Sequence, residues 1–258
     1  MKGIAMRRRG FICLACQAAA ASIGVATTGA ALAQPHPEFG YAGANGPSHW
    51  GGMSEHWRSC SAGVNQSPVE LARFVEADLP ALQISYGPSG REVVHTGHAI
   101  QVNAGPGSTL GVDGLSFRLL QFHFHAPSEH HLEGRDFPLE AHLVHQNQAG
   151  ELAVIGVFFE SGAPNDLLGL VTASLPSGPG QRRLLGSGLT PAGLLPADRD
   201  YLRYSGSLTT PPCSEGVRWL VMKRPMTASP AQIEAVGAAL GFANNRPTQP
   251  LGARTLLR

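Results

Sequence analysis

A mainly β fold with minor helices is the class that the sequence predicts, and three observations support it. The chain of 258 residues contains 32 glycines and 20 prolines, which favour many turns and short strands over long helices. Several apolar runs follow the two-residue period of a strand. One segment near the C-terminus carries clear signals for the start and the end of a helix.

Composition excludes several classes of protein. The chain is 43% apolar and 14% charged, with a net charge of +1. A nucleic-acid binder would usually carry a basic excess, and a disordered chain would have fewer apolar residues or a larger net charge. The sequence shows no internal linker or repeat, so a single domain over residues 41–258 is the simplest interpretation.

The first 33 residues have the pattern of a signal peptide. Four basic residues precede an apolar stretch, which ends in the small-x-small cleavage pattern Ala31-Leu32-Ala33. The alternative is a membrane anchor, but the stretch is rich in Ala, Gly and Thr rather than Leu or Ile. The pair Arg8-Arg9 also resembles a twin-arginine signal, so both export routes stay open. We therefore predict an exported protein, periplasmic or secreted, with no stable membrane span after processing.

Removal of this segment changes the composition of the remaining chain. The net charge falls from +1 to about −3, because four basic residues and no acidic residue are lost. Cys60 and Cys213 become the only cysteines. In an exported protein such a pair predicts one disulfide, with two buried free thiols as the alternative. Residues 34–40 form a short lead-in to the domain.

Four runs indicate strands. In the run 119–125, Leu120, Phe122 and Phe124 share one face, and Gln121 shares the other with two histidines. The run 140–145 also alternates, with residues 140, 142 and 144 on one face. The other two runs are nearly continuous apolar stretches, as in strands buried on both faces: 152–159 and 217–222.

The helix begins near Ser229 and ends near Gly241. Ser229 is a favourable N-cap, Pro230 suits the first helical position, and Gln232 completes a capping box. Gly241 is a typical C-terminal stop. The segment 176–198 is rich in Gly, Pro and Leu, so we expect a long surface loop there.

Three histidines form the chief candidate site. His123 and His125 are two residues apart on one predicted strand, so both imidazoles project from the same face. His142 lies on the next strand, and the 16 residues between His125 and His142 allow a turn and a return. Three neutral imidazoles suit tetrahedral zinc with an open fourth position, which is typical of a catalytic site. A lone His-x-His pair would more often be structural.

Two polar residues could orient these imidazoles. Gln121 precedes His123 by two residues, and Glu140 precedes His142 by two, so each pair shares a strand face. Imidazoles that bind a metal usually donate their other N–H to a carboxylate, a carbonyl or a water. We therefore expect Gln121 and Glu140 to hold the ligands.

Sequence motifs along most of the chain resemble the α-class carbonic anhydrases. QFHFHAPSEH at 121–130 and EAHLVH at 140–145 resemble the zinc core of that family. Further matches are YAGANGPSHW at 41–50, QSPV at 66–69, YSGSLTTPPC at 204–213 and NNRPTQPL at 244–251. The resemblance implies an exported bacterial member, with a single domain around a large, twisted, mostly antiparallel central sheet.

The family's chemistry then implies roles for the conserved-looking positions. His123, His125 and His142 would bind one zinc ion per chain, and a zinc-bound hydroxide would attack carbon dioxide to give bicarbonate and a proton. Thr209 would accept a hydrogen bond from that hydroxide and donate one to Glu129. An ionised Glu129 only accepts hydrogen bonds, as this arrangement requires.

Carbon dioxide is apolar and needs an apolar pocket. The resemblance implies that Val144, Val154, Leu208 and Trp219 form its wall, with Thr210 near bound bicarbonate. Val144 shares a strand face with His142, as a wall residue must. For Val154 and Trp219, a place in the core is an equally good interpretation of the sequence.

Proton release is the other half of the reaction. The resemblance makes His98 the proton shuttle, because a histidine titrates near neutral pH. Tyr41, Thr96 and Gln101 would order the waters of the pocket, although Thr96 and Gln101 replace asparagines familiar from animal enzymes. Strand alternation places His98 and Gln101 on opposite faces, so both can line the site only if a bulge intervenes.

The resemblance also implies structural features. His130 would be structural, bonded to Tyr204 or Glu140. Cys60 and Cys213 would form the disulfide of exported bacterial members and brace the loop that carries Thr209. Cis peptides are expected at Ser67-Pro68 and Pro211-Pro212.

Two other functions compete with hydration of carbon dioxide. A non-catalytic relative used for binding would typically lack a zinc ligand, and here all three histidines remain. A hydrolase acting on esters is expected as a side activity. We predict a small-molecule substrate, no nucleic-acid partner, and either a monomer or a homodimer.

Overall fold

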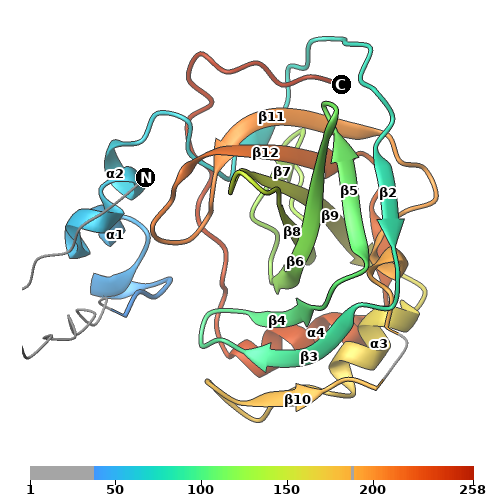
Figure 1. Ribbon diagram of the computed structural model, residues 1–258. Helices are drawn as coiled ribbons and strands as arrows, with labels where there is room; N and C mark the ends of the chain where they lie inside the picture. The colour runs from blue at the N-terminus through green and yellow to red at the C-terminus, as the bar shows by residue number, and fades with distance from the viewer. Residues whose placement is uncertain (1–37, 187–188) are drawn as a thin grey trace, which may run out of the picture. The chain divides into compact units, whose positions relative to one another are not determined.

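One large sheet organises the described part of the chain, residues 38–186 and 189–258 of the computed structural model (Figure 1). The predicted signal peptide lies outside the described residues. The strands are β1 (Glu70–Leu71), β2 (Gln83–Tyr86), β3 (Gly90–His95), β4 (Ile100–Ala104), β5 (Ser108–Val112), β6 (Leu115–His125), β7 (His131–Leu132), β8 (Leu139–Gln146), β9 (Leu152–Ser161), β10 (Arg182–Leu184), β11 (Tyr201–Ser207), β12 (Glu215–Met222) and β13 (Met226–Ala228).

Helices are short and lie around this sheet. The α-helices are α1 (Trp50–Met53), α2 (Ser59–Ala62), α3 (Asp166–Thr172) and α4 (Pro230–Leu240), and the 3-10 turns are η1 (Gly43–Asn45), η2 (Glu55–Trp57) and η3 (Pro191–Leu194). The predicted C-terminal helix is confirmed in detail. Ser229 and Gln232 form the capping box, and Gly241 ends α4 at a φ of 75°, a conformation that glycine adopts without strain.

The sheet is mixed but mostly antiparallel, as we expected. Among the described residues eleven strands belong to it, in the order β10-β3-β4-β6-β8-β9-β12-β11, with β2, β5 and β13 attached at its sides. β9 runs parallel to β12 and β13, and the other pairs in this sheet are antiparallel. The four predicted strands are therefore confirmed as parts of β6, β8, β9 and β12.

Two apolar clusters cover the opposite faces of the central strands. On β8, Leu143 belongs to one cluster together with Phe122, Phe124 and parts of α3 and α4. The next residue, Val144, belongs to the other. This two-residue alternation leaves the second face for polar residues of β6 and β8 as well.

Strict alternation fails at one place in β6. The register between β6 and β8 shifts between Leu119 and Gln121, so that Leu120 has no partner. Leu119 is fully buried in the cluster with Phe122 and Phe124, whereas Leu120, which we expected beside them, is half-buried and does not belong to that cluster. A bulge of this kind leaves no mark in the sequence pattern.

The segment 176–198 is more ordered than the expected surface loop. It contains β10, which pairs with β3, and the 3-10 turn η3. Leu194 and Leu195 are buried against the core. The loop prediction was therefore wrong for these elements, because Gly and Pro mark turns but say little about the leucines between them.

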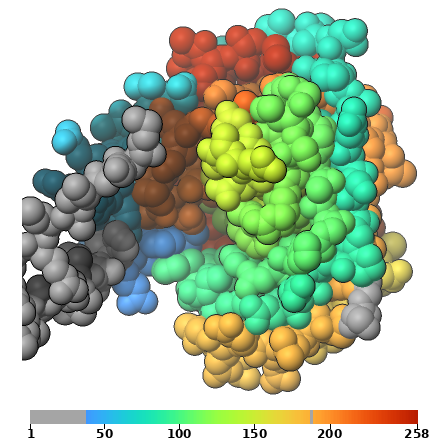
Figure 2. All heavy atoms as spheres, viewed as in Figure 1, coloured from blue at the N-terminus to red at the C-terminus, as the bar shows by residue number. Residues whose placement is uncertain are grey.

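Both ends of the described domain are packed. In the predicted lead-in, Phe39 contacts Trp50 and Trp57 in a small apolar cluster. At the other end, Val75 N–H donates to the carbonyl of Leu256 (2.8 Å), and Figure 2 shows the red C-terminal segment against the teal one. Within the part of the chain that is described, no helix is long and apolar enough to cross a bilayer.

Candidate metal centre

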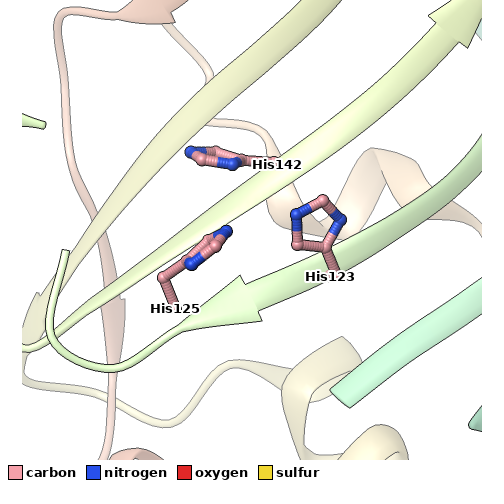
Figure 3. A group of neighbouring side chains, drawn as sticks. All are labelled: His123, His125 and His142. Carbon is pink, nitrogen blue, oxygen red and sulfur yellow. The ribbon is translucent and has the colours of Figure 1, made fainter. Parts of the chain in front are cut away.

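The three predicted ligand histidines converge on one face of the sheet. His123 on β6 lies directly opposite His142 on β8, and His125 follows two residues along β6. Figure 3 shows the three rings turned toward a common centre. One nitrogen from each ring lies within 4.8 Å of the other two. Three nitrogens this close together could all coordinate a single metal ion.

A separate acceptor fixes the outer nitrogen of each ring. These contacts leave Nε2 of the first two rings and Nδ1 of the third to face the centre. The outer contacts, each 2.8 Å, are His123 Nδ1 with Gln121 Oε1, His125 Nδ1 with the Asn244 carbonyl, and His142 Nε2 with Glu140 Oε1. The expected roles of Gln121 and Glu140 therefore have the geometry they require.

Asn244 is a residue of this centre to which the sequence motifs assigned no role. Its side-chain oxygen accepts the amide of Ala126, and its Nδ2 donates to the carbonyls of His98 and Phe124. Its own carbonyl receives the hydrogen bond from His125. The matched NNRPTQPL motif contained it, but the partner of its carbonyl is 119 positions away in the sequence.

Electrostatics favour the neutral form of His123 and His125, and act in the opposite direction on His142. Burial lowers the pKa of His123 and His125, and neighbouring histidines lower it further. Burial alone would also lower the pKa of His142, but the Glu140 carboxylate outweighs it and raises that pKa. Neutral imidazoles with lone pairs on the inner nitrogens are the form that binds a metal.

Glu140 is the anionic end of a buried polar chain. One carboxylate oxygen accepts from His130 Nδ1 (2.7 Å) and His142 Nε2 (2.8 Å), and the other accepts two backbone amides. Burial raises the pKa of Glu140, but the two histidines more than offset this and hold it well below its ordinary range. His130 Nε2 contacts the Tyr204 hydroxyl (2.6 Å), so both partners expected for His130 are confirmed.

Two inward atoms show that the site suits a cation. His125 Nε2 and Glu129 Oε2 are buried, 3.4 Å apart, and neither has a hydrogen-bond partner within the described residues. An unsatisfied buried polar atom costs about 1–3 kcal/mol, and a metal ion at the centre would remove this cost for His125 Nε2. Three imidazole nitrogens are a donor set that zinc accepts, so the residues present fit the group.

The predicted pocket residues lie beside the histidines. Val144 pairs with Val154, which pairs with Trp219, so the three lie side by side across β8, β9 and β12. The Trp219 ring is 4.8 Å from the His142 ring, and Leu208 packs against the same apolar cluster. An apolar surface therefore adjoins the metal-facing nitrogens.

Comparison with known proteins decides the family. A family model described as eukaryotic-type carbonic anhydrase matches residues 45–258. The chain belongs to the α-carbonic anhydrase family. Members are lyases that hydrate carbon dioxide, and this chain is an enzyme of that class.

Bacterial carbonic anhydrases are similar over nearly their whole length. Those of Pectobacterium carotovorum and Neisseria gonorrhoeae are 43% and 44% identical to this chain, over 85% and 86% of it and 90% and 88% of their own lengths. The α-carbonic anhydrase of Thermovibrio ammonificans, solved with the inhibitor sulfanilamide, is 48% identical with a TM-score of 0.84. That alignment covers 86% of this chain and 99% of the solved one.

His98, the expected shuttle of this carbonic anhydrase, lies in the turn between β3 and β4. β4 begins only at Ile100, and the register shift between β3 and β4 lies at Gly90 and Glu92. His98 and Gln101 therefore do not share a strand, and strand alternation does not decide which way the His98 side chain points. His98 is partly exposed, and its ring stacks on Phe39 with centroids 3.8 Å apart.

The three residues expected to order pocket waters have different environments. The Thr96 hydroxyl bonds to backbone groups of the turn that carries His98. Gln101 pairs with His123 across β4 and β6, and its Nε2 donates to Asn103. The buried hydroxyl of Tyr41 has no partner in the described ranges, and burial followed by the charge of Glu129 raises its pKa. Their role in a water network stays a prediction.

The loop that carries Thr209 and Thr210, to which the family resemblance assigns catalytic roles, follows β11. Thr209 is 5% exposed, and Thr210 is half-buried. The bond expected from Thr209 to the free oxygen of Glu129 is not formed, since Oε2 has no partner within the described chain and Oε1 accepts from Arg246 N–H (2.8 Å). The Thr209 role therefore stays a prediction.

The predicted disulfide is present. Cys60 on α2 is bonded to Cys213, four residues after Thr209, and the alternative of two free thiols is excluded. Ser67-Pro68 and Pro211-Pro212 are cis as expected, and Ala126-Pro127 is cis as well.

Proposed function

We propose that this chain hydrates carbon dioxide reversibly to bicarbonate and a proton, using one zinc ion held by His123, His125 and His142. A single observation carries the proposal. Three imidazoles present their inner nitrogens to one centre while a separate acceptor orients each outer nitrogen. Three protein ligands leave the fourth position of a tetrahedral ion open for chemistry. A bound zinc ion would make water acidic enough to supply a nucleophile at neutral pH.

Glu129 and Thr209 are proposed to orient that nucleophile. Glu129 is fully buried, and its free Oε2 lies 3.4 Å from His125 Nε2 and 3.8 Å from His142 Nδ1. An acceptor beside the centre can hold the proton of the Thr209 hydroxyl, which then accepts from the nucleophile. The fixed direction of that hydrogen bond would aim a lone pair at the substrate.

The apolar surface is proposed to bind carbon dioxide. Val144, Val154 and Trp219 are each less than 9% exposed, and Leu208 packs beside them. They offer no hydrogen bond that would retain a polar competitor. Thr210, next to Thr209, would contact the charged product bicarbonate.

His98 is proposed to carry the proton to the solvent. Burial lowers the pKa of His98 from its ordinary value, Glu38 raises it and His95 lowers it, and the net direction is down. A neutral imidazole at pH 7 can accept a proton and pass it to bulk buffer. Tyr41, Thr96 and Gln101 would order the waters that connect it to the centre.

We also propose that the enzyme is exported. A disulfide persists in oxidising compartments, so the Cys60–Cys213 bond supports a periplasmic or secreted enzyme. Activated esters would be slower second substrates of the same nucleophile, and hydrolysis of a chromogenic aryl ester would reveal that activity.

Stopped-flow hydration of carbon dioxide on the mature protein tests the proposal, together with a metal count. We expect about one zinc per chain, and loss of activity on chelation or in His123→Ala. His49→Ala, which removes an exposed histidine, should keep full activity. A folded, zinc-loaded preparation without hydration activity would overturn the proposal.

A further inference from the structure

His95 is a buried histidine outside the metal centre. It ends β3, is 2% exposed, and pairs with Ile100 at the start of β4. Its Nδ1 accepts the amide of Gly97 (3.1 Å), and its Nε2 contacts the carbonyl of Ala239 on α4 (3.0 Å). Because Nδ1 accepts a hydrogen bond, the ring proton lies on Nε2, which donates it to the carbonyl of Ala239. Both ring nitrogens are therefore committed, in a single tautomer.

The backbone amides of residues 96–99 and the carbonyl of His98 all have partners. The Thr96 hydroxyl accepts the amides of His98 and Ala99, and the Thr96 amide donates to the Ala99 carbonyl. The Asn244 side chain donates to the His98 carbonyl. The Thr96–Gly97 peptide is instead held by the ring of His95, which accepts the Gly97 amide.

We infer that His95 is a positioning residue, which fixes the Gly97 peptide and thereby the place of the His98 imidazole. Gly97 has a φ of +93°, so other orientations of this peptide are easily reached unless something holds it. Thr96 is exposed, and water can replace its hydrogen bonds, whereas the contact from buried His95 has no such substitute. Rotation of the peptide would move His98 off its stack on Phe39.

This inference rests on the proposed shuttle role of His98. Proton release and the attack on carbon dioxide are separate steps. kcat/KM for carbon dioxide reports steps up to the release of bicarbonate, whereas kcat also includes proton release. A misplaced His98 should therefore lower kcat in dilute buffer and leave kcat/KM unchanged.

Two matched substitutions separate the bonds of His95. Asn places a side-chain oxygen where Nδ1 lies, so His95→Asn keeps an acceptor for Gly97 and loses the contact with Ala239. Gln places its amide near Nε2, so His95→Gln keeps the donor to Ala239 and loses the acceptor. Each variant loses one hydrogen bond, so we expect similar small losses of stability.

Kinetics in dilute buffer should tell the two variants apart. We expect His95→Gln to lower kcat about tenfold at constant kcat/KM, with recovery when imidazole is added, and His95→Asn to stay near wild type. NMR signals of the His98 ring should lose the shift caused by Phe39 only in His95→Gln. Equal effects of both variants on kcat, in proportion to lost stability, would show a merely structural role and overturn the inference.

A His98→Ala variant separates the two proposals. If it keeps full kcat in dilute buffer, the shuttle proposal is wrong. The NMR signals then decide the inference alone: a displaced His98 ring in His95→Gln supports it, and an unchanged ring overturns it.

Discussion

The histidines of the described chain differ in what their two ring nitrogens contact. The three rings of the candidate metal centre each bond through one nitrogen to Gln121, Asn244 or Glu140, and no hydrogen bond engages the other nitrogen within the described residues. His130 uses both nitrogens, on Glu140 and Tyr204. Residue type alone therefore assigns no function: a ligand is recognised by the nitrogen left without a protein partner.

His145 shows what a fully committed histidine does for stability. It is completely buried, with Nε2 2.6 Å from the Tyr86 hydroxyl and Nδ1 3.3 Å from the carbonyl of Ala153. A proton added to this ring would be buried without a counter-charge. Burial therefore lowers its pKa to about 4, and backbone hydrogen bonds with Ala153 and Leu143 oppose this only in part.

We predict that the free energy of unfolding decreases as the pH is lowered, because His145 takes up a proton when the chain unfolds. The folded pKa is about 4 and the ordinary value is 6.5, so the unfolded chain binds more protons in between. The contribution is complete above pH 6.5 and is lost as the pH falls toward 4, by about 3 kcal/mol in all. Urea unfolding at several pH values measures it. His145→Gln keeps an acceptor for Tyr86 and should remove this component, and an unchanged pH profile in that variant would contradict the prediction.

At the scale of elements, the sequence predicted what local patterns determine. Alternation placed His123, His125 and His142 on one face, and capping residues placed the ends of α4. The bulge at Leu120, the strand β10 and the role of Asn244 escaped prediction. Each depends on contacts with distant segments: the ladder with β8, the edge of β3, and the ring of His125.

The disulfide joins two elements that lie far apart in the chain. It links α2 to the segment after β11 across 153 positions, next to the loop that carries Thr209. Additional bonds hold that loop, including Cys213 N–H to the Thr210 carbonyl and Leu208 N–H to that of Ser214. The crosslink acts mainly on the unfolded chain, whose freedom it restricts.

We predict that a Cys60→Ser, Cys213→Ser double variant is less stable by up to about 5 kcal/mol, the value expected for so long a loop. Guanidinium unfolding of oxidised wild type, reduced wild type and the variant measures the loss. The last two should agree, because both lack only the crosslink. A reduced wild type as stable as the oxidised one would contradict the prediction.

At the scale of the whole molecule, Arg246 connects the N-terminal and C-terminal parts of the domain to the metal centre. Its guanidinium is 1% exposed and donates to the carbonyls of Cys60 and Ser67 and to Gln66 Oε1. Its backbone amide donates to Glu129 Oε1. Segments around positions 60, 66 and 129 thus meet at one buried residue, Arg246, which places Glu129 relative to the disulfide-bonded segment.

Replacing Arg246 should destabilise the whole domain. Arg246→Leu leaves three buried acceptors without donors and removes a positive charge that interacts with Glu129, so we expect a loss of about 3–5 kcal/mol in urea unfolding. Arg246→Lys keeps the charge but not the planar guanidinium, so it should recover only part of the lost stability.

Arg254 is the matched control, because it also donates to three carbonyls, those of Leu251, Ser205 and Pro250, but is partly exposed. Arg254→Leu should cost about 1 kcal/mol. Equal losses at both positions would show that burial of the arginine does not matter, and that the centre does not depend on this connection.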